Sequence, residues 1–381
     1  MKIVLAPDSY KGSLTAKKAC ESMAKGIKRA LPEADVIQIP MADGGEGTVQ
    51  SLVDATSGQI HTARVDGPFR NKVDAKYGIL GDGETAVIEM AEASGLYLIA
   101  TEQRNPLHTT TYGTGELIYN ALERGCRRFV LGLGGSATND GGMGMAQALG
   151  ARFLDEAGFE LPPGGGSLGM LAHIETISMD IRIKESSFIV ACDVDNPLCG
   201  GNGASNVFGP QKGATPEMVV ELDNNLSHYA NIIKKDLGID IKDTPGAGAA
   251  GGLGAGMLAF LGATLKSGVD IVIEAVELRK HLEEADLVFT GEGQCDFQTI
   301  NGKVPFGVAR EARKQGIPCI VLAGSIGQGI DLLYDHGVTS VFSIVDSPMS
   351  LDQAMAGAEE LLEKTAERIS RVIKIEKEHN Y

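Results

Sequence analysis

The sequence predicts an α/β protein with parallel sheets, and three observations support this fold class. Short apolar segments typical of buried strands alternate with segments of helical periodicity at both ends of the chain. Several of these strand segments are followed at once by polar, glycine-rich turns, as at the carboxyl edge of a parallel sheet. The chain has 381 residues, which is more than one typical domain and indicates two or three.

The first sixty residues show this alternation clearly. Residues 2–7 are expected to form a buried strand, and Ser13 is expected to cap a helix whose apolar residues recur at helical spacing as far as Leu31. Residues 36–39 predict a second strand, and the glycine-rich residues 43–48 lead into a further helix. These are successive β-loop-α units of a doubly wound sheet.

The C-terminal third repeats the pattern. Three apolar segments predict strands, at residues 287–290, 319–322 and 341–344. A helix is expected after Pro305, and a closing helix from Ser350, where Ser350 and Gln353 match a capping box. Leu351 and Met355 begin one apolar face of that closing helix.

The middle of the chain alternates less regularly and is richer in glycine. We therefore expect a doubly wound, Rossmann-like or flavodoxin-like domain formed from residues 1–68 and 276–381. Residues 69–275 are expected to form a second, inserted α/β domain.

Composition restricts the partners. The net charge is −16, from 50 acidic and 34 basic residues, so nucleic acids and anionic membranes would be repelled. The six cysteines form no CxxC pair, the first apolar segment is too short for a signal peptide, and no apolar segment is long enough to span a bilayer. We expect a cytoplasmic protein; its oligomeric state stays open, with a homo-oligomer as one outcome.

The first candidate site follows the first strand. Asp8 could bind a metal or accept a substrate proton, Ser9 lies beside it, and Lys11 could bind a phosphate or a carboxylate. The same residues are equally compatible with a turn that holds a capping serine and a solvated lysine.

The second candidate site is the turn at residues 42–47. Asp43 and Glu46 are separated by two glycines, so that carboxylate oxygens could converge on Mg²⁺. The alternative is a plain turn in which Glu46 stabilises the start of a helix. Two adjacent glycines exceed what a turn requires, which favours the metal site.

The third candidate is a loop with five glycines at residues 132–142, directly after the predicted strand at residues 129–131. Its many backbone N–H groups suit a phosphate cradle, although it does not match a Walker A loop. A passive turn is the less favoured alternative. The candidate binding residues are Gly134, Gly135, Ser136, Ala137, Thr138, Asn139 and Asp140.

A fourth candidate follows the predicted strand at residues 188–191. Asp193 could bind a metal or activate a hydroxyl group, and Lys212, in a Gly-Pro turn further along, is a candidate to bind substrate or phosphate. Ordinary turns explain both segments equally well.

The last candidate is the polar stretch after the predicted strand at residues 287–290. Glu292 and Asp296 stand near Lys303, a combination that phosphoryl transfer requires, and Gly291 and Gly293 flank the first acid. A long polar loop without a ligand is the less favoured alternative.

Seven segments, in one order along the whole chain, resemble the type I glycerate kinase family of bacteria. They are APDSYKGS at 6–13, ADGGEGT at 42–48, GGSATNDGG at 134–142, ACDVDNP at 191–197, FGPQKG at 208–213, PGAGAAGG at 245–252 and TGEG at 290–293. The resemblance implies glycerate as substrate, ATP as donor, and two α/β domains with the active site in the cleft between them. It also implies a 2-phosphate product. In one departure, this chain has Gln294 and Cys295 where the family usually has arginine and an aliphatic residue.

Together these observations suggest direct in-line phosphoryl transfer. The loops at 134–140 and 291–293 would hold the ATP phosphates, and Lys11 and Lys303 would bind phosphate or the glycerate carboxylate. Asp193 is the first choice to orient the attacking hydroxyl and Asp8 the second. The acids expected to hold Mg²⁺ are Asp43, Glu46, Glu292 and Asp296.

Two other functions are considered. A nicotinamide-dependent hydroxy-acid oxidoreductase should have a dinucleotide fingerprint after the first strand, and none is present there. The GxGxxG match within residues 246–254 does not follow a predicted strand and is weak. A non-catalytic nucleotide or metabolite sensor would not need the clustered acids.

Overall fold

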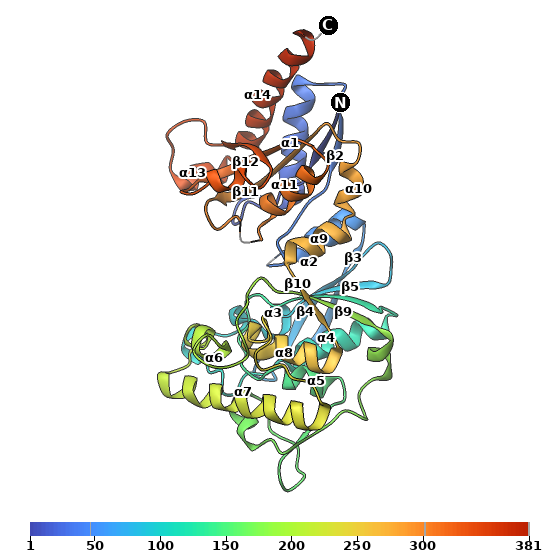
Figure 1. The fold of residues 1–381 in the computed structure, drawn as a ribbon, viewed down its shortest axis with the longest axis vertical. Helices are drawn as coiled ribbons and strands as arrows, with labels where there is room; N and C mark the ends of the chain where they lie inside the picture. The colour runs from blue at the N-terminus through green and yellow to red at the C-terminus, as the bar shows by residue number, and fades with distance from the viewer. Residues whose placement is uncertain (46, 301, 380–381) are drawn as a thin grey trace. The chain divides into compact units, whose positions relative to one another are not determined.

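The computed structural model describes residues 1–45, 47–300 and 302–379, with the backbone alone for residues 376–379. It confirms the predicted α/β class and divides into two compact units. Unit 1 consists of Met1–Asp43, Gln50–Ser57 and Ser267–Tyr381, and unit 2 of Gly44–Val49 and Gly58–Lys266. Both chain ends therefore build unit 1, where the blue α1 and the red α14 lie side by side (Figure 1).

Unit 1 contains a five-stranded parallel sheet in the order β13-β12-β11-β1-β2. Its strands are β1 (Lys2–Leu5), β2 (Asp35–Gln38), β11 (Leu287–Cys295), β12 (Cys319–Ile326) and β13 (Val338–Ser343). Counted within the unit, this is the flavodoxin-like order 2-1-3-4-5. The strand order reverses between β1 and β11, and ligands of open α/β sheets bind at the carboxyl ends of such a strand pair.

Unit 1 also contains α-helices. They are α1 (Ala16–Ala30), α2 (Thr48–Thr56), α9 (Gly268–Ala275), α10 (Leu278–Leu282), α11 (Val304–Lys314), α12 (Asp331–Tyr334), α13 (Leu351–Ala356) and α14 (Ala358–His379). Helices α1 and α14 pack on each other and share an apolar core with β1 and β11 that includes Leu5, Met23 and Leu362. A Cβ atom on Gly26 would lie 2.0 Å from the Glu363 carbonyl oxygen, so this glycine allows the close approach of the two helices.

Two helix starts can be compared with the sequence. The capping box of Ser350 and Gln353 at the start of α13 is confirmed. Ser13 as a helix cap is wrong, because Thr15 accepts the bond from the Lys18 N–H while the Ser13 hydroxyl donates to the Met355 carbonyl oxygen at 2.6 Å. The closing helix is also two helices, since α13 ends at Ala356 before α14 begins.

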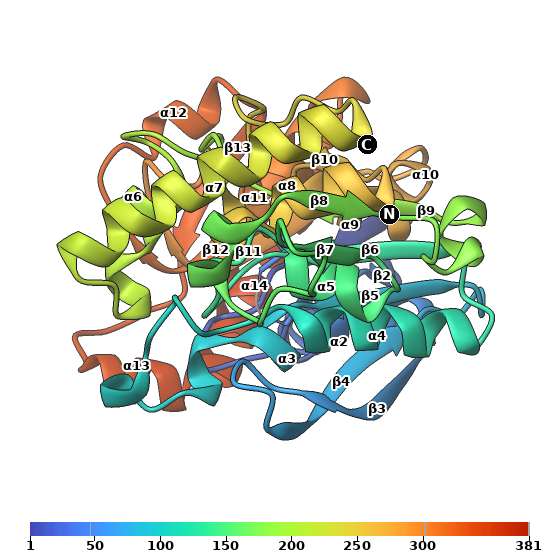
Figure 2. The ribbon, with the colours of Figure 1, turned by 90° about the horizontal axis from the view of Figure 1, so that it is seen from below.

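Unit 2 has a mixed six-stranded sheet in the order β10-β9-β6-β5-β4-β3, and a two-stranded sheet of β7 and β8. The strands are β3 (Gln59–Asp66), β4 (Lys72–Ile79), β5 (Thr85–Glu89), β6 (Arg128–Gly132), β7 (Arg152–Leu154), β8 (His173–Glu175), β9 (Ser187–Ala191) and β10 (Thr264–Lys266). Figure 2 shows the antiparallel hairpin of β3 and β4 at one edge. This hairpin lies entirely in unit 2, whereas the sequence led us to expect a change of domain within it, at residue 69.

Unit 2 contains both α-helices and 3₁₀ helices. The α-helices are α3 (Ala91–Ser94), α4 (Tyr112–Glu123), α5 (Met143–Ala148), α6 (Ala204–Phe208), α7 (Pro216–Leu237) and α8 (Ala249–Leu261). The 3₁₀ helices are η1 (Leu96–Leu98), η2 (Thr101–Gln103), η3 (Gly165–Met170), η4 (Ile181–Glu185) and η5 (Pro210–Lys212). In neither unit does a helix within the described residues combine the length and apolar character needed to cross a membrane.

Candidate active site

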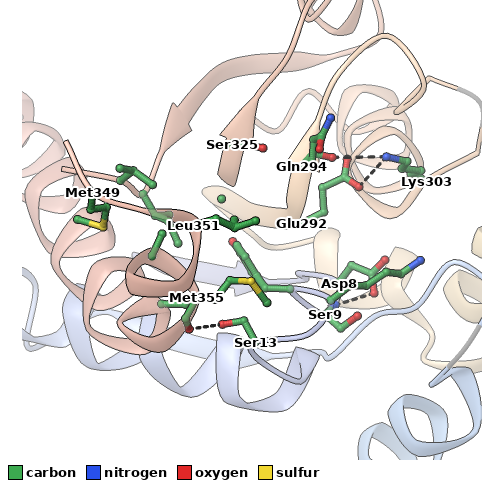
Figure 3. A pocket seen from close by; sticks show the side chains of 18 of the residues that line it. Asp8, Ser9, Ser13, Glu292, Gln294, Lys303, Ser325, Met349, Leu351 and Met355 are labelled. Carbon is green, nitrogen blue, oxygen red and sulfur yellow. Dashed lines mark hydrogen bonds and ion pairs between the residues drawn. The ribbon is translucent and has the colours of Figure 1, made fainter. Parts of the chain in front are cut away.

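A cavity of about 530 Å³ opens in unit 1 at the carboxyl ends of β1 and β11 (Figure 3). The β1–α1 loop is anchored to this edge of the sheet. The Asp8 N–H donates to the Gly291 carbonyl oxygen at 2.9 Å, and the Tyr10 hydroxyl donates to the Leu322 carbonyl oxygen at 2.7 Å. These bonds fix the loop that carries Asp8 and Lys11 beside the strand that carries Glu292.

Asp8 is the most perturbed carboxyl group of this cavity. Its side chain is buried, and the burial, followed by repulsion from Asp43, raises its pKa to about 7. The Ser9 N–H donates to Asp8 Oδ1 at 2.6 Å and opposes the rise. Asp43 itself lies 3.7 Å from the Lys11 ammonium group. Asp8 is therefore poised to exchange a proton near neutral pH.

Glu292 lies in β11 and holds Lys303 at the cavity. Its Oε1 accepts a hydrogen bond of 2.7 Å from the Thr299 hydroxyl, and its Oε2 lies 3.2 Å from Lys303 Nζ. Burial raises the pKa of Glu292, and Thr299 and Lys303 lower it in part. The pair leaves the lysine partly exposed at the polar end of the cavity (Figure 3).

Asp296 shapes the loop after β11. Its two carboxylate oxygens accept bonds of 2.9 Å, one from the Gln294 side-chain amide and one from the Gln298 N–H. The Asp296 N–H donates to Thr299, which in turn donates to Glu292. Gln294, which stands in place of the usual arginine, thus binds an acid of its own loop and also lines the cavity.

The structure gathers several predicted residues around this single cavity. Those that line it are Asp8, Ser9, Lys11, Asp43, Glu292, Gly293 and Lys303. Glu46 lies outside the described residues. Residues 134–140, Asp193 and Lys212 all belong to unit 2.

In unit 2, the glycine-rich loop after β6 has an exposed and a buried part. Gly134 and Gly135 are exposed, whereas Ser136 to Asp140 are buried. Asp140 accepts hydrogen bonds from the N–H groups of Thr111, Gly142 and Gly144. The buried part is therefore held by its own protein contacts, and the exposed backbone is the part open to a ligand.

Two further predicted residues of unit 2 differ sharply in exposure. The Lys212 side chain is buried, and its ammonium group donates to the Thr138 carbonyl oxygen at 2.7 Å. Burial lowers the pKa of Lys212 to about 7. Asp193 follows β9 and is exposed.

The cavity offers carboxylate oxygens of the kind that bind Mg²⁺, but not a complete set of protein ligands. Residues 1–45, 47–300 and 302–379 contain no group of three or more His, Cys, Asp or Glu side chains arranged for a metal. Mg²⁺ commonly takes one or two carboxylates and completes its shell with phosphates and water. Asp43 and Glu292 offer such oxygens, and the mutual repulsion of the acids around Asp8 is what a cation would offset.

The sequence did not reveal the opposite end of the cavity. Met349, Leu351 and Met355 line it, and Leu351 is 74% exposed. We expected Leu351 to pack on one apolar face of the closing helix, and this is wrong because the chain breaks into α13 and α14. The signal in the sequence that could have predicted this end is Leu351 itself, an apolar residue at the first position of a helix capped by Ser350.

Comparison with known proteins identifies the family of the chain. The family model described as the glycerate kinase family matches residues 3–374. A glycerate kinase of Bacillus subtilis is 53% identical, over 99% of each chain, and a glycerate 2-kinase of Escherichia coli is 52% identical, over 98% of each. A crystal structure described as a glycerate kinase 2 from Salmonella typhimurium LT2 has a TM-score of 0.92 and 48% identity, and covers 99% of each chain. The chain therefore belongs to the glycerate kinase family.

Proposed function

We propose that this protein transfers the terminal phosphate of ATP to the 2-hydroxyl of glycerate by direct in-line attack. Family membership supports the substrate pair, and the name of the Escherichia coli relative supports the 2-position. The six free cysteines agree with a reducing compartment, so we propose the cytoplasm as its location.

One observation carries the proposal: three carboxylates and two lysines meet at one cavity at the strand-order reversal of unit 1. Phosphoryl transfer requires positioned cations for the phosphate charge and an acid to orient the attacking hydroxyl. Lys11 and Lys303 supply the cations, and the carboxylates are those of Asp8, Asp43 and Glu292. The protein has a net charge of −16, so these local cations must attract an anionic substrate against the overall field.

We assign the proton-accepting role to Asp8. A general base works best when its pKa lies near the working pH, and burial gives Asp8 a pKa of about 7. Asp193, the first choice from sequence, is exposed at the end of β9 in unit 2 and stays the alternative.

Asp43 and Glu292 would hold Mg²⁺, which offsets the charge of the phosphates when it is bound. Asp296 is less suited to this role, because it does not line the cavity and both of its oxygens accept bonds within its own loop. For unit 2, we propose that the exposed backbone of Gly134 and Gly135 binds an anionic group of a substrate. The buried side chains of residues 136–140 and Lys212 would maintain the shape of that loop.

The test is a coupled ADP-release assay with D-glycerate and ATP-Mg²⁺, with NMR identification of the product. We expect ADP release that depends on glycerate, together with 2-phosphoglycerate. Comparison of Asp8→Asn with Asp193→Asn then assigns the base, because the variant of the true base should lose turnover by orders of magnitude with its fold intact. Absence of glycerate-dependent ADP release would reject the kinase, and NAD(P)H formation instead would favour the oxidoreductase.

A further inference from the structure

The cavity of unit 1 has two chemically different ends. The polar end holds Asp8, Glu292 and Lys303, and the apolar end is formed by Met349, Leu351 and Met355 (Figure 3). Buried Ile344, directly after β13, also lines the cavity. Leu351 leaves 74% of its surface exposed, which is a large unpaired apolar area for a side chain that lines a charged site.

The two ends follow the order of the strands. The charged residues come from the switch point at β1 and β11, and the apolar ones follow β13 or belong to α13. The cavity therefore extends along the carboxyl edge of the sheet. Its volume of about 530 Å³ falls within the roughly 300–1,000 Å³ of sites for drug-sized ligands and is more than a small hydroxy acid fills.

We propose that the apolar end seats the adenine base of ATP, with the triphosphate extending to Lys11 and Lys303. This rests on the proposed function, in which ATP is the donor, and adds where the nucleoside binds. An aromatic base is flat and apolar on its faces, and methionine side chains are polarizable and adapt to such faces. The phosphates need cations, and the lysines at the other end provide them.

The apolar end is also tied to the loop that carries the polar residues. The Ser13 hydroxyl donates to the Met355 carbonyl oxygen at 2.6 Å. A Cβ atom on Gly12, which has a φ of +76°, would lie 2.9 Å from Met355 Cε. The β1–α1 loop, with Asp8 and Lys11, therefore contacts Met355 of the apolar end that we propose binds the base.

The experiment separates recognition of the base from recognition of the phosphates. Calorimetry would measure the Kd of ATP and of inorganic tripolyphosphate, each with Mg²⁺, for the wild type and for Leu351→Asn and Met349→Asn. The matched control is Val372→Asn, because Val372 is a similarly exposed apolar residue of unit 1, on α14. Leu351 is mostly exposed, so its variant should keep the melting temperature of the wild type, and this is checked by circular dichroism.

We expect ATP to bind about tenfold more weakly to Leu351→Asn and to Met349→Asn, because apolar contact with the base is lost. The affinity for tripolyphosphate should change less than about twofold, and the control should match the wild type. The inference would be overturned if both variants kept the ATP affinity of the wild type. It would also be overturned if the affinities for ATP and for tripolyphosphate decreased equally. If the two variants show the expected pattern but the wild type does not phosphorylate glycerate, the inference stands and the kinase is rejected. If the wild type phosphorylates glycerate but both variants bind ATP as the wild type does, the kinase stands and the inference is rejected.

Discussion

Asp8 in unit 1 and Asp140 in unit 2 are both buried carboxyl groups after a strand of a sheet, but their surroundings differ. Asp140 is fully buried and accepts bonds from three backbone N–H groups and from the hydroxyl groups of Thr110 and Thr111. Asp8 accepts a bond from the Ser9 N–H and is repelled by Asp43 and Glu292.

The difference shows what each acid contributes to the protein. A buried carboxylate with many donors stabilises the loop that surrounds it, and its removal leaves those donors unpaired. A buried carboxylate among like charges destabilises the fold, and such strain is typical of functional sites. We therefore expect changes at Asp8 to affect catalysis and changes at Asp140 to affect stability.

The largest expected effect is on turnover, from Asp8→Asn. If Asp8 accepts the proton, kcat should fall roughly 100- to 10,000-fold, because the amide cannot act as a base. A steady-state assay with saturating ATP and glycerate measures this. Turnover within a few-fold of the wild type would remove Asp8 from the mechanism.

The same substitution should also change how the free energy of unfolding depends on pH. The folded pKa of Asp8, about 7, lies above its ordinary value of 3.8, so its contribution to stability is full below pH 3.8 and is lost as the pH rises through about 7. The free energy of unfolding of the wild type, relative to Asp8→Asn, should therefore decrease from about pH 4 to about pH 7 and then level off. Urea denaturation at a series of pH values, without ligands, measures it.

The second effect is on stability, from Asp140→Ala. The N–H groups of Thr111, Gly142 and Gly144 lose their acceptor inside the protein, so we expect a loss of about 3–5 kcal/mol. Urea denaturation followed by circular dichroism measures it.

Asp155→Ala is the control for that change. Asp155 accepts bonds from the N–H groups of Ala157 and Phe159, but in an exposed turn of the same unit, where water can replace it. Its loss should stay below about 1.5 kcal/mol. Equal losses in the two variants would contradict the distinction between Asp140 and an ordinary turn.

The third effect is a change in pH dependence, from Lys212→Met. Burial lowers the folded pKa of Lys212 to about 7, against an ordinary value of 10.5, so the unfolded chain binds the extra proton between these values. Stability of the wild type should thus rise with pH from about 7 to about 10, by about 3–4 kcal/mol relative to the variant. Denaturation at pH 7 and pH 9.5 measures it.

An exposed lysine provides the comparison for Lys212. Lys234 lies on α7 and pairs with Asp240, so Lys234→Met should leave the slope between pH 7 and pH 9.5 nearly unchanged. A wild-type slope that survives in Lys212→Met would show that Lys212 is charged in the folded protein.

These contrasts also show what could be predicted from sequence. The strands of unit 1 and the charged residues that line its cavity follow from local patterns, because parallel strands place their carboxyl ends at one edge. Burial of Lys212 and Asp140 does not follow from such patterns. Residues distant in sequence create it: the chain around Thr111 surrounds Asp140, and Thr138 accepts the bond from Lys212.

The apolar end of the cavity was missed for a related reason. The periodicity of Leu351 and Met355 continues into α14, and only the break at Gly357 separates them from that core-facing helix. The expected domain boundary likewise divided the hairpin of β3 and β4, because no local sequence pattern assigns this antiparallel pair to unit 2.

The smallest expected effect comes from restoring the family's usual arginine with Gln294→Arg. Gln294 lines the polar end of the cavity and its amide donates to Asp296, so an arginine there could keep an ionic contact with Asp296 and add positive charge near the phosphates. A partly exposed cation contributes about 0.2–1 kcal/mol, which corresponds to a KM for ATP lowered roughly 1.4- to 5-fold. Gln294→Met, similar in length and uncharged, is the control and should not lower the KM. A KM raised by the arginine would mean that the Gln294–Asp296 bond orders the loop more strongly than the added charge attracts the phosphates.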